Sequence, residues 1–172
     1  MCMNYRVEQL NEKNVGDYAR INALSWKQSY KGIVNDEFLD LINTEEEINK
    51  TIEKLKSSLD DNSKRFLIKV NDRYAGILRV RKTKYPEYNH CGELGALYLL
   101  DEFKGKGYGK ILFNKAVEEL KKMGYTSMII GCLVGNPTNN FYKHMGGILV
   151  GTNDFSIPNQ MLKENLYYFD NI

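Results

Sequence analysis

Apolar residues recur at helical spacing through most of the amino-terminal third of the chain. Between residues 14 and 29 they fall every three or four positions, which is typical of a helix with one buried face. A second, shorter helix is expected from Asn35. Thr44 followed by Glu47 is a capping-box pattern, and it predicts a charged helix that runs to about Leu59. We therefore expect three consecutive helices here.

The rest of the chain alternates or clusters its apolar residues in ways that predict strands. Short segments rich in β-branched and aromatic residues are separated by turn residues. The predicted strands are Tyr5–Gln9, Arg65–Val70, Tyr74–Lys82, Glu93–Leu100, Tyr125–Val134, Gly147–Phe155 and Leu162–Asp170. Asn71-Asp72-Arg73 is the expected turn of a hairpin. The near-continuous apolar run from Tyr125 is typical of a strand that is buried on both faces.

Two further helices separate the later strands. One carries Ile111 to Met123, with Gly124 placed as a C-cap, and the other spans about Thr138 to His144. The order of elements predicts an α+β fold, in which a central, mostly antiparallel sheet of six to seven strands is flanked by helices on both faces. Since no repeat or linker divides the chain, residues 1–172 are expected to form a single domain.

Charge and composition remove several classes of function. The net charge of +2 provides no large basic field, so no nucleic-acid partner is expected. The longest apolar run is too short to cross a bilayer and the amino terminus lacks a signal-peptide pattern, so we expect no membrane partner and a cytoplasmic location. No metal site is expected, because neither paired nor metal-like spacing joins Cys2, Cys91, Cys132, His90 and His144.

A glycine-rich turn follows the strand that ends at Leu100. It reads Lys104-Gly105-Lys106-Gly107-Tyr108-Gly109-Lys110 and leads directly into a helix. Free N–H groups at a helix start, glycines that permit close approach and nearby lysines together suit a diphosphate. The spacing excludes a dinucleotide fingerprint, because Lys110 stands where that motif has its last glycine. It also excludes a P-loop. A glycine-rich loop without a ligand is the alternative.

This turn resembles the R/Q-x-x-G-x-G/A acetyl-CoA signature of the GNAT superfamily of N-acetyltransferases. Further along, Asn136-Pro137 and Phe141-Tyr142-Lys143-His144-Met145-Gly146-Gly147 resemble the second signature of that family, an Asn before a helix that bears an F-Y pair and ends in Gly. The two signatures cover roughly residues 93–147. One position departs from the pattern, since Lys104 replaces Arg or Gln and offers a point charge rather than a bidentate fork. Backbone N–H groups should still hold the phosphates.

The resemblance implies acetyl-CoA as the cofactor and a GNAT-like fold. An acetyl-CoA-binding core is expected at about 91–147 and the acceptor-side helices at about 14–59. Backbone groups of Leu97, Tyr98 and Leu99 would pair with the pantetheine arm, and one of their N–H groups could serve the oxyanion. Asn136 resembles the pantetheine contact of the family, although an asparagine there could equally cap the following helix.

The resemblance also indicates two catalytic residues. Aminolysis of a thioester needs a neutral amine, a stabilised oxyanion and a protonated leaving group. Glu93 is the candidate base, with a relay through water or a solvent-facing carboxylate at a strand end as alternatives. Tyr142 is the candidate acid for the departing thiolate, with an ordinary core tyrosine as the alternative. Phe141 is expected only to pack.

The acceptor is predicted to be a small primary amine. The segment from Ser25 to Ile33 resembles a subgroup that includes bacterial polyamine acetyltransferases. Trp26 and Tyr30 share one helix face and could wall a pocket for a cation, or could simply be core. The run Glu45-Glu46-Glu47, with Asp36 and Glu37, could attract a polycation, or could be a solvated face.

Other functions and assemblies stay open at this stage. A protein N-terminal or lysine acetyltransferase would need an open groove, and a non-catalytic acyl-CoA sensor would tolerate the loss of Tyr142. The oligomeric state is not determined by the sequence, and a homodimer is one expected assembly because many relatives pair through sheet edges or helices.

Overall fold

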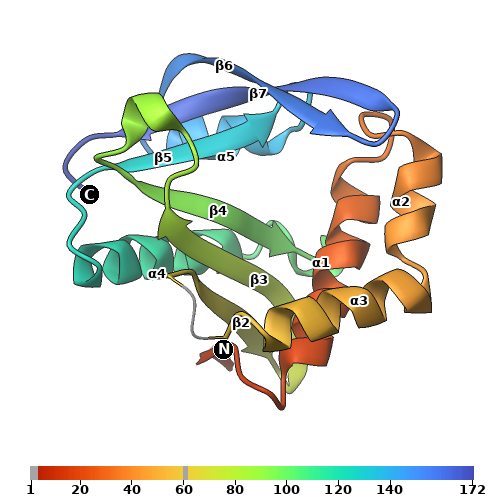
Figure 1. The fold of residues 1–172 in the computed structure, drawn as a ribbon. Coiled ribbons are helices and arrows are strands. Elements are labelled where there is room, and N and C mark those ends of the chain that lie inside the picture. The colour runs from red at the N-terminus through yellow and green to blue at the C-terminus, as the bar shows by residue number, and fades with distance from the viewer. Residues whose placement is uncertain (1–3, 60–61) are drawn as a thin grey trace.

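The computed structural model describes residues 4–59 and 62–172, which form one seven-stranded sheet with five α-helices around it (Figure 1). The strands are β1 (Tyr5–Gln9), β2 (Lys64–Val70), β3 (Arg73–Lys82), β4 (Gly92–Leu99), β5 (Met128–Leu133), β6 (Ile148–Ile157) and β7 (Gln160–Phe169). The helices are α1 (Val15–Ser29), α2 (Asp36–Ile42), α3 (Glu45–Lys56), α4 (Tyr108–Lys122) and α5 (Thr138–His144). The strand order β1-β2-β3-β4-β5-β7-β6 confirms the predicted α+β fold.

Side-chain caps define where the amino-terminal helices begin. The side chain of Thr44 accepts a hydrogen bond from the backbone N–H of Glu47, which confirms the capping box before α3. Asn35 caps α2 in the same way, since its Oδ1 accepts from the N–H of Phe38 at 2.8 Å. These caps fix the short connections between α1, α2 and α3, and Figure 1 shows the three helices grouped at one side of the sheet.

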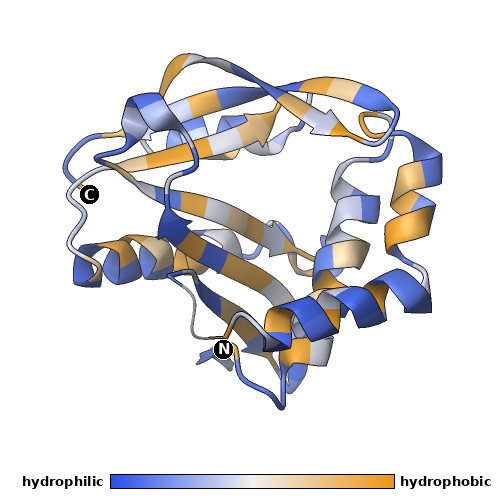
Figure 2. Cartoon of the chain, viewed as in Figure 1, coloured by the Kyte–Doolittle hydropathy of each residue, from blue (hydrophilic) through white to orange (hydrophobic). Residues whose placement is uncertain are grey.

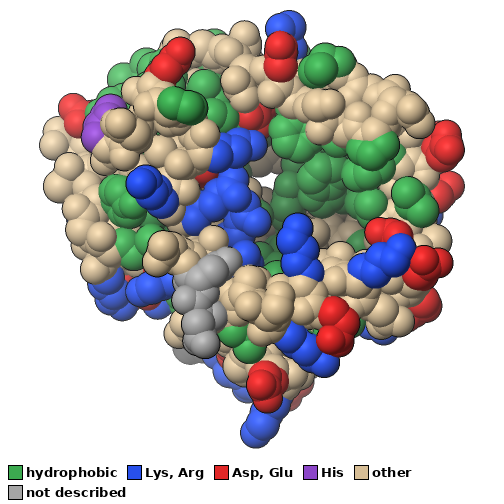
Figure 3. Space-filling model, in the orientation of Figure 1, with side chains coloured by type: hydrophobic (Ala, Val, Ile, Leu, Met, Phe, Trp, Pro, Cys, Tyr) green, Lys and Arg blue, Asp and Glu red, His purple; other side chains and the backbone are tan. Residues whose placement is uncertain are grey.

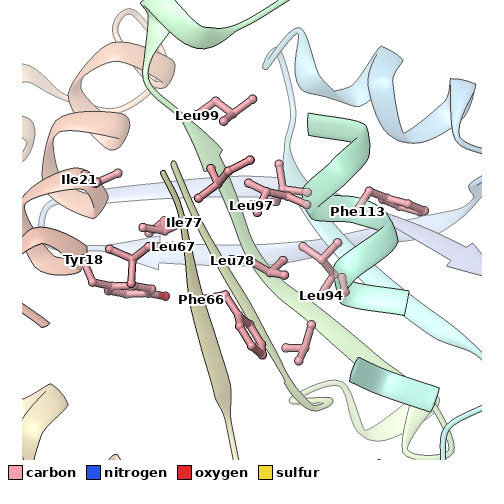
Figure 4. Packing of buried hydrophobic residues seen from close by; sticks show 14 of the residues in the cluster. Tyr18, Ile21, Phe66, Leu67, Ile77, Leu78, Leu94, Leu97, Leu99 and Phe113 are labelled. Carbon is pink, nitrogen blue, oxygen red and sulfur yellow. The ribbon is translucent and has the colours of Figure 1, made fainter. Parts of the chain in front are cut away.

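The core lies on both faces of the central strands, and different helices cover each face. In Figure 4, Leu67 and Ile77 lie beside Tyr18 of α1, whereas Leu78 lies on the side of α4. This division follows from the alternation of side chains along a strand. Leu67, Ile77 and Leu78 have no exposed surface, and burying each contributes roughly 1.5–3 kcal/mol. Figure 2 shows the contrast between hydrophobic β5 and mostly hydrophilic α3.

The structure corrects some predicted boundaries. The hairpin turn between β2 and β3 uses only Asn71 and Asp72, which have φ of +46° and +64°, and Arg73 already belongs to β3. Asparagine and aspartate tolerate this left-handed region better than other residues that carry a side chain. α3 ends at Lys56 rather than near residue 59. Within the described chain, no helix is long and apolar enough to cross a membrane.

Candidate active site

β4 and β5 run parallel and separate after a very short stretch of pairing. In the described chain only two residue pairs join them, Gly92 with Met128 and Glu93 with Ile129. β4 then stays paired with β3 as far as Leu99, while β5 stays paired with β7. One edge of each strand is therefore left without a strand partner. Its N–H and C=O groups can pair with an extended ligand, as an added strand would.

A β-bulge between β3 and β4 lies just beyond Glu93, the last residue of β4 that pairs with β5. Arg79 of β3 pairs with Ala96 and Val80 pairs with Leu94, so Gly95 has no partner on β3. A Cβ atom at Gly95 would lie 3.0 Å from Nε of Arg79. A glycine at the bulge thus allows the guanidinium group to lie directly against the strand.

Two cavities meet where the strands separate, and Figure 3 shows the hollow in this face of the molecule. The first, which we call the turn-side cavity, has a volume of about 350 Å³ and lies against β4, the glycine-rich turn and α5. The second, the helix-side cleft, has a volume of about 480 Å³ and is lined from α1, α2, α3, β3 and β4. Both are lined by Tyr30, Leu94, Gly95, Ala96, Tyr98 and Gly131. Ligands in the two cavities would therefore be neighbours.

The glycine-rich turn forms one end of the turn-side cavity. Gly105 and Gly107 have φ of +72° and +87°, a region that favours glycine. Gly107 directly precedes α4, whose first N–H groups have no partner within the helix. Lys104 and Lys110 also line the cavity, with Nζ of Lys104 lying 2.6 Å from Asp101. Backbone donors, a helix N-terminus and two ammonium groups at one place suit a phosphate group.

α5 places Tyr142 in the wall of the turn-side cavity. The residue is only 4% exposed, and its ring packs against the rings of Phe141 and Tyr167. Its hydroxyl group has no hydrogen-bond partner among residues 4–59 and 62–172. Burial raises the pKa of this phenol well above its ordinary value. Tyr142 therefore stays protonated at neutral pH and can donate its proton to a ligand.

A pair of tyrosines stands between the two cavities. The hydroxyl groups of Tyr30 and Tyr98 are 2.8 Å apart. Burial raises the pKa of Tyr98 to about 12 and that of Tyr30 well above its usual value, so both stay neutral. The ring of Tyr30 also meets that of Trp26 edge to face, with centroids 4.8 Å apart. Trp26 and Tyr30 thus line the helix-side cleft and also pack against each other.

The carboxylate of Glu93 is buried in the helix-side cleft and is already hydrogen-bonded. Arg81 donates to it through Nη2 at 2.9 Å and through Nε at 3.2 Å. The backbone N–H of Lys84 donates to it at 2.9 Å. Since Glu93 is only 2% exposed, the alternative of a solvent-facing strand end is wrong.

Cys132 of β5 lines the turn-side cavity and is the cysteine with access to a ligand there. Burial, with a smaller effect of the Glu164 carboxylate, raises the pKa of its thiol to about 12. A thiol with this pKa is almost fully protonated at neutral pH and is a poor nucleophile. Cys91 is buried away from the cavity, and Cys2 lies outside the described residues.

The sequence profile described as the Acetyltransferase (GNAT) family matches residues 21–146. The chain belongs to the GNAT family. An uncharacterized N-acetyltransferase of Bacillus subtilis (strain 168), YuaI, is 25% identical over 162 residues, which are 92% of this chain and 88% of YuaI. As a GNAT protein, the chain is an acetyl-CoA-dependent N-acetyltransferase.

Solved structures have the same fold at low sequence identity. The PaiA N-acetyltransferase of Thermoplasma acidophilum, in complex with coenzyme A, has a TM-score of 0.66 at 18% identity, over 95% of this chain and 98% of its own. YncA of Salmonella typhimurium, a putative acetyltransferase with acetyl-CoA, has a TM-score of 0.72 at 10% identity, over 97% and 94%. These similarities confirm the predicted GNAT-like fold.

The GNAT fold places most of the predicted cofactor and catalytic residues around one cavity. Those lining the turn-side cavity are Leu97, Tyr98, Leu99, Lys104, Gly105, Gly107, Gly109, Lys110, Asn136 and Tyr142. Three side chains do not line it, and one of them, Glu93, lines the helix-side cleft instead. Nζ of Lys106 donates to the carbonyl of Glu102, and Tyr108 is buried against Phe103. Oδ1 of Asn136 accepts from the N–H of Thr138 at 2.9 Å, but the N-cap position of α5 is Pro137, so Asn136 is not the N-cap residue.

The acidic run forms the first turn of α3, on a helix that lines the cleft with other residues. Glu45 forms an exposed ion pair with Arg20, and Glu46 and Glu47 both pair with Lys50. None of the three glutamates lines the helix-side cleft, nor do Asp36 and Glu37. These carboxylates therefore do not contact a ligand in the cleft, and the exposed ion pairs fit the solvated-face alternative for the run.

Sequence reasoning missed the basic side chains of this GNAT cleft. Arg79 and Arg81 lie two residues apart on β3, and both line the helix-side cleft. Residues at this spacing share one face of a strand, so two arginines at alternate positions directly after the apolar run of β3 were the available signal. Gly95 offered no comparable signal, since a bulge depends on the pairing of β3 with β4.

Replacing Gly107 with Ala should weaken coenzyme A binding on the order of tenfold. The left-handed φ is strained for alanine, and a shift of the turn would misplace a charge-assisted N–H contact to phosphate. Gly124, at the other end of α4, has φ of +92° and equally open space, so Gly124→Ala is the matched control. Calorimetry with coenzyme A should show a loss for Gly107→Ala alone, with similar drops in Tm for both. Equal affinities would contradict the assignment of this turn.

Proposed function

We propose that this enzyme transfers the acetyl group of acetyl-CoA directly to the primary amine of a small molecule, with both substrates bound together. The observation that carries the proposal is the meeting of two cavities at the point where β4 and β5 separate. One cavity has the donors that suit a phosphate group. The other is a separate space of about 480 Å³, large enough for a small acceptor.

The cofactor would lie along the turn-side cavity. The glycine-rich turn and the start of α4 would hold its diphosphate, and the unpaired edge of Leu97, Tyr98 and Leu99 would hold its extended arm. That arm would carry the thioester toward the separation point, where the bulge at Gly95 leaves backbone groups unpaired with β3. A backbone N–H group there could stabilise the negative charge that develops on the carbonyl oxygen.

Tyr142 is proposed as the general acid for the leaving sulfur. Its hydroxyl lacks a protein partner in the described chain, it lines the cavity, and burial keeps it protonated. A buried thiolate is also destabilised by desolvation, so the sulfur has a stronger tendency to take a proton there than in water. The proton transfer thus remains favourable although the pKa of the phenol is raised.

Glu93 is proposed as the final acceptor of the proton that the amine loses, through a bound water. Arg81 and Lys84 already occupy both of its carboxylate oxygens, which argues against direct contact with the amine. Oε1 accepts only the bond from Nη2 of Arg81, so it keeps a lone pair that can accept from a water. In this assignment Glu93 is the base and a water relays the proton to it, so the two candidates for the base act together.

Direct transfer is supported by the state of Cys132. A covalent acetyl-enzyme would need a nucleophile in the turn-side cavity, and a thiol with a pKa of about 12 is a poor one at neutral pH. The amine itself is therefore the nucleophile. In the net reaction the N–C bond forms, the C–S bond breaks, one proton of the ammonium ends on sulfur and a second reaches solvent.

Thiol release from acetyl-CoA with a panel of amines, amino acids, amino sugars and short peptides tests the proposal. Turnover is expected with one class of small amine, and Tyr142→Phe should lower kcat on the order of 10² because the acid is lost. Tyr167→Phe is the control, since it removes a buried hydroxyl that donates to Asn139 beside the same ring. An unchanged kcat for Tyr142→Phe removes it from the mechanism. Coenzyme A binding without any turnover would favour an acyl-CoA sensor or a protein acceptor.

Glu93→Gln should lower kcat/KM most at neutral pH. An amine with a pKa of ~10.4 is mostly charged there and needs a base, whereas at higher pH a growing fraction is already neutral. The loss should therefore shrink steadily between pH 7 and pH 9.5. The measurement is a pH profile of both enzymes with the same acceptor. A loss that is equally large at every pH would assign Glu93 a purely structural role with Arg81.

A homodimer remains a prediction. β6 is an edge strand, and it exposes the large apolar side chains of Ile148, Leu149 and Val150. An exposed apolar strand edge is a surface at which a second copy could pair, which supports the assembly expected from the family.

A further inference from the structure

The helix-side cleft has an excess of positive charge. Its basic lining residues are Lys54, Arg65, Arg79, Arg81 and Lys84, and its acidic ones are Glu93 and Glu164. In Figure 3, Lys and Arg side chains gather along one side of the hollow. A polyamine, the acceptor that the sequence favoured, would bring several more positive charges into this space. Like charges at short range repel, most strongly where water is excluded.

Both acids in the cleft already have protein partners. Arg81 holds Glu93 through two N–H groups. Glu164 accepts a hydrogen bond from the hydroxyl of Tyr85 at 2.6 Å, and Nζ of Lys84 lies 3.7 Å away. The carboxylates are thus occupied by residues of the chain, and they leave little negative charge to attract a cationic ligand.

Arg79 lines the cleft from β3 and forms no ion pair with any acid among residues 4–59 and 62–172. Its Nε–H is buried and has no hydrogen-bond partner in the part of the chain that the structure describes. A buried donor without a partner is costly, and a guanidinium group presents a fork that fits a carboxylate or phosphate. Burial and the neighbouring Arg81 lower the pKa of Arg79, which means that its charge is poorly compensated. The group lies against Gly95, where the two cavities meet.

An apolar wall completes the cleft. The rings of Phe38 and Phe155 pack around Trp26, with centroids 6.1 and 6.2 Å from that of Trp26. Ile42 and Leu133 line the same space. Figure 3 shows hydrophobic side chains on the side of the hollow away from the gathered Lys and Arg side chains. A matching ligand would therefore have a charged end and an apolar end.

We infer that the acceptor is a small anionic amine, in which a carboxylate or phosphate lies a few atoms from the amino group and an apolar group extends from the same carbon skeleton. The anion pairs with Arg79, the apolar group packs on the wall around Trp26, and the amine lies toward Gly95 and the thioester. The inference rests on the proposed function, and it names the substrate class for the same acetyl transfer.

Matched acceptors test the role of the anion. Phenylalanine and phenethylamine differ only by the carboxylate, the phosphonate analogue of phenylalanine replaces that group, and spermidine represents the polyamines. In the thiol-release assay, kcat/KM should be at least tenfold higher for phenylalanine or its phosphonate than for phenethylamine, because one charge-assisted contact is lost. Whichever of phenylalanine and its phosphonate has the higher kcat/KM shows whether the site prefers a carboxylate or a phosphonate. Equal or faster turnover of phenethylamine or spermidine would overturn the inference while leaving the proposed function in place.

Variants of Arg79 connect this preference to the cleft. Arg79→Gln should bring the ratio between phenylalanine and phenethylamine close to one, and Arg79→Lys should retain part of it by keeping the charge without the fork. Arg20→Gln is the matched control, since Arg20 is an exposed arginine of α1 that pairs with Glu45. It should leave the ratio unchanged. A ratio unaffected by both Arg79 variants would overturn the assignment.

A binding measurement separates this inference from the transfer itself. Calorimetry of the coenzyme A-loaded protein should show tighter binding of phenylalanine than of phenethylamine, and the difference should vanish in Arg79→Gln. Should no amine be acetylated, the proposed function fails, yet this affinity difference still tests the anion site. Equal affinities in the unmodified protein would overturn the inference independently of turnover. Thermal unfolding and coenzyme A affinity of each variant show that it has folded.

Discussion

The site depends on two parallel strands that pair for only two residue pairs and then separate. Backbone N–H and C=O groups that lose a partner are costly to bury, so such a separation must be stabilised elsewhere or filled. Here β3 and β7 hold the outer edges of β4 and β5, and the core beneath α4 fixes the angle between them. The inner edges remain open to a ligand. In the arrangement that we propose, this separation of the strands provides the groove for the cofactor.

Burial at this opening raises the pKa of groups that are neutral when protonated and lowers the pKa of groups that are charged when protonated. Desolvation favours the neutral forms, so it keeps the phenol of Tyr142 and the thiol of Cys132 protonated. The phenol can therefore donate a proton, whereas the thiol is a poor nucleophile toward the thioester. The same desolvation makes the charge of Arg79 costly until an anion reaches it. In the mechanism that we propose, desolvation therefore supports an acid and disfavours a covalent intermediate in the turn-side cavity, and it favours an anionic acceptor in the helix-side cleft.

The sequence predicted the architecture well because its signals were local. Caps, turns and periodicity depend on neighbouring residues, and the Thr44 cap and the buried β5 were found where expected. The two signatures also located the turn and Tyr142. What was missed depends on pairing between distant segments. The bulge at Gly95 and the ion pair of Glu93 arise from the register of β3 on β4, and no spacing within one strand encodes that register.

Hydrogen–deuterium exchange with and without coenzyme A tests the central claim most directly, because it needs no knowledge of the acceptor. If the separated edge of β4 and the glycine-rich turn hold the cofactor, saturating coenzyme A should slow exchange in peptides covering residues 97–99 and 105–110. Exchange along β6, which is distant from the turn-side cavity in sheet order, should not change. Protection absent from both segments while coenzyme A is bound would contradict the account.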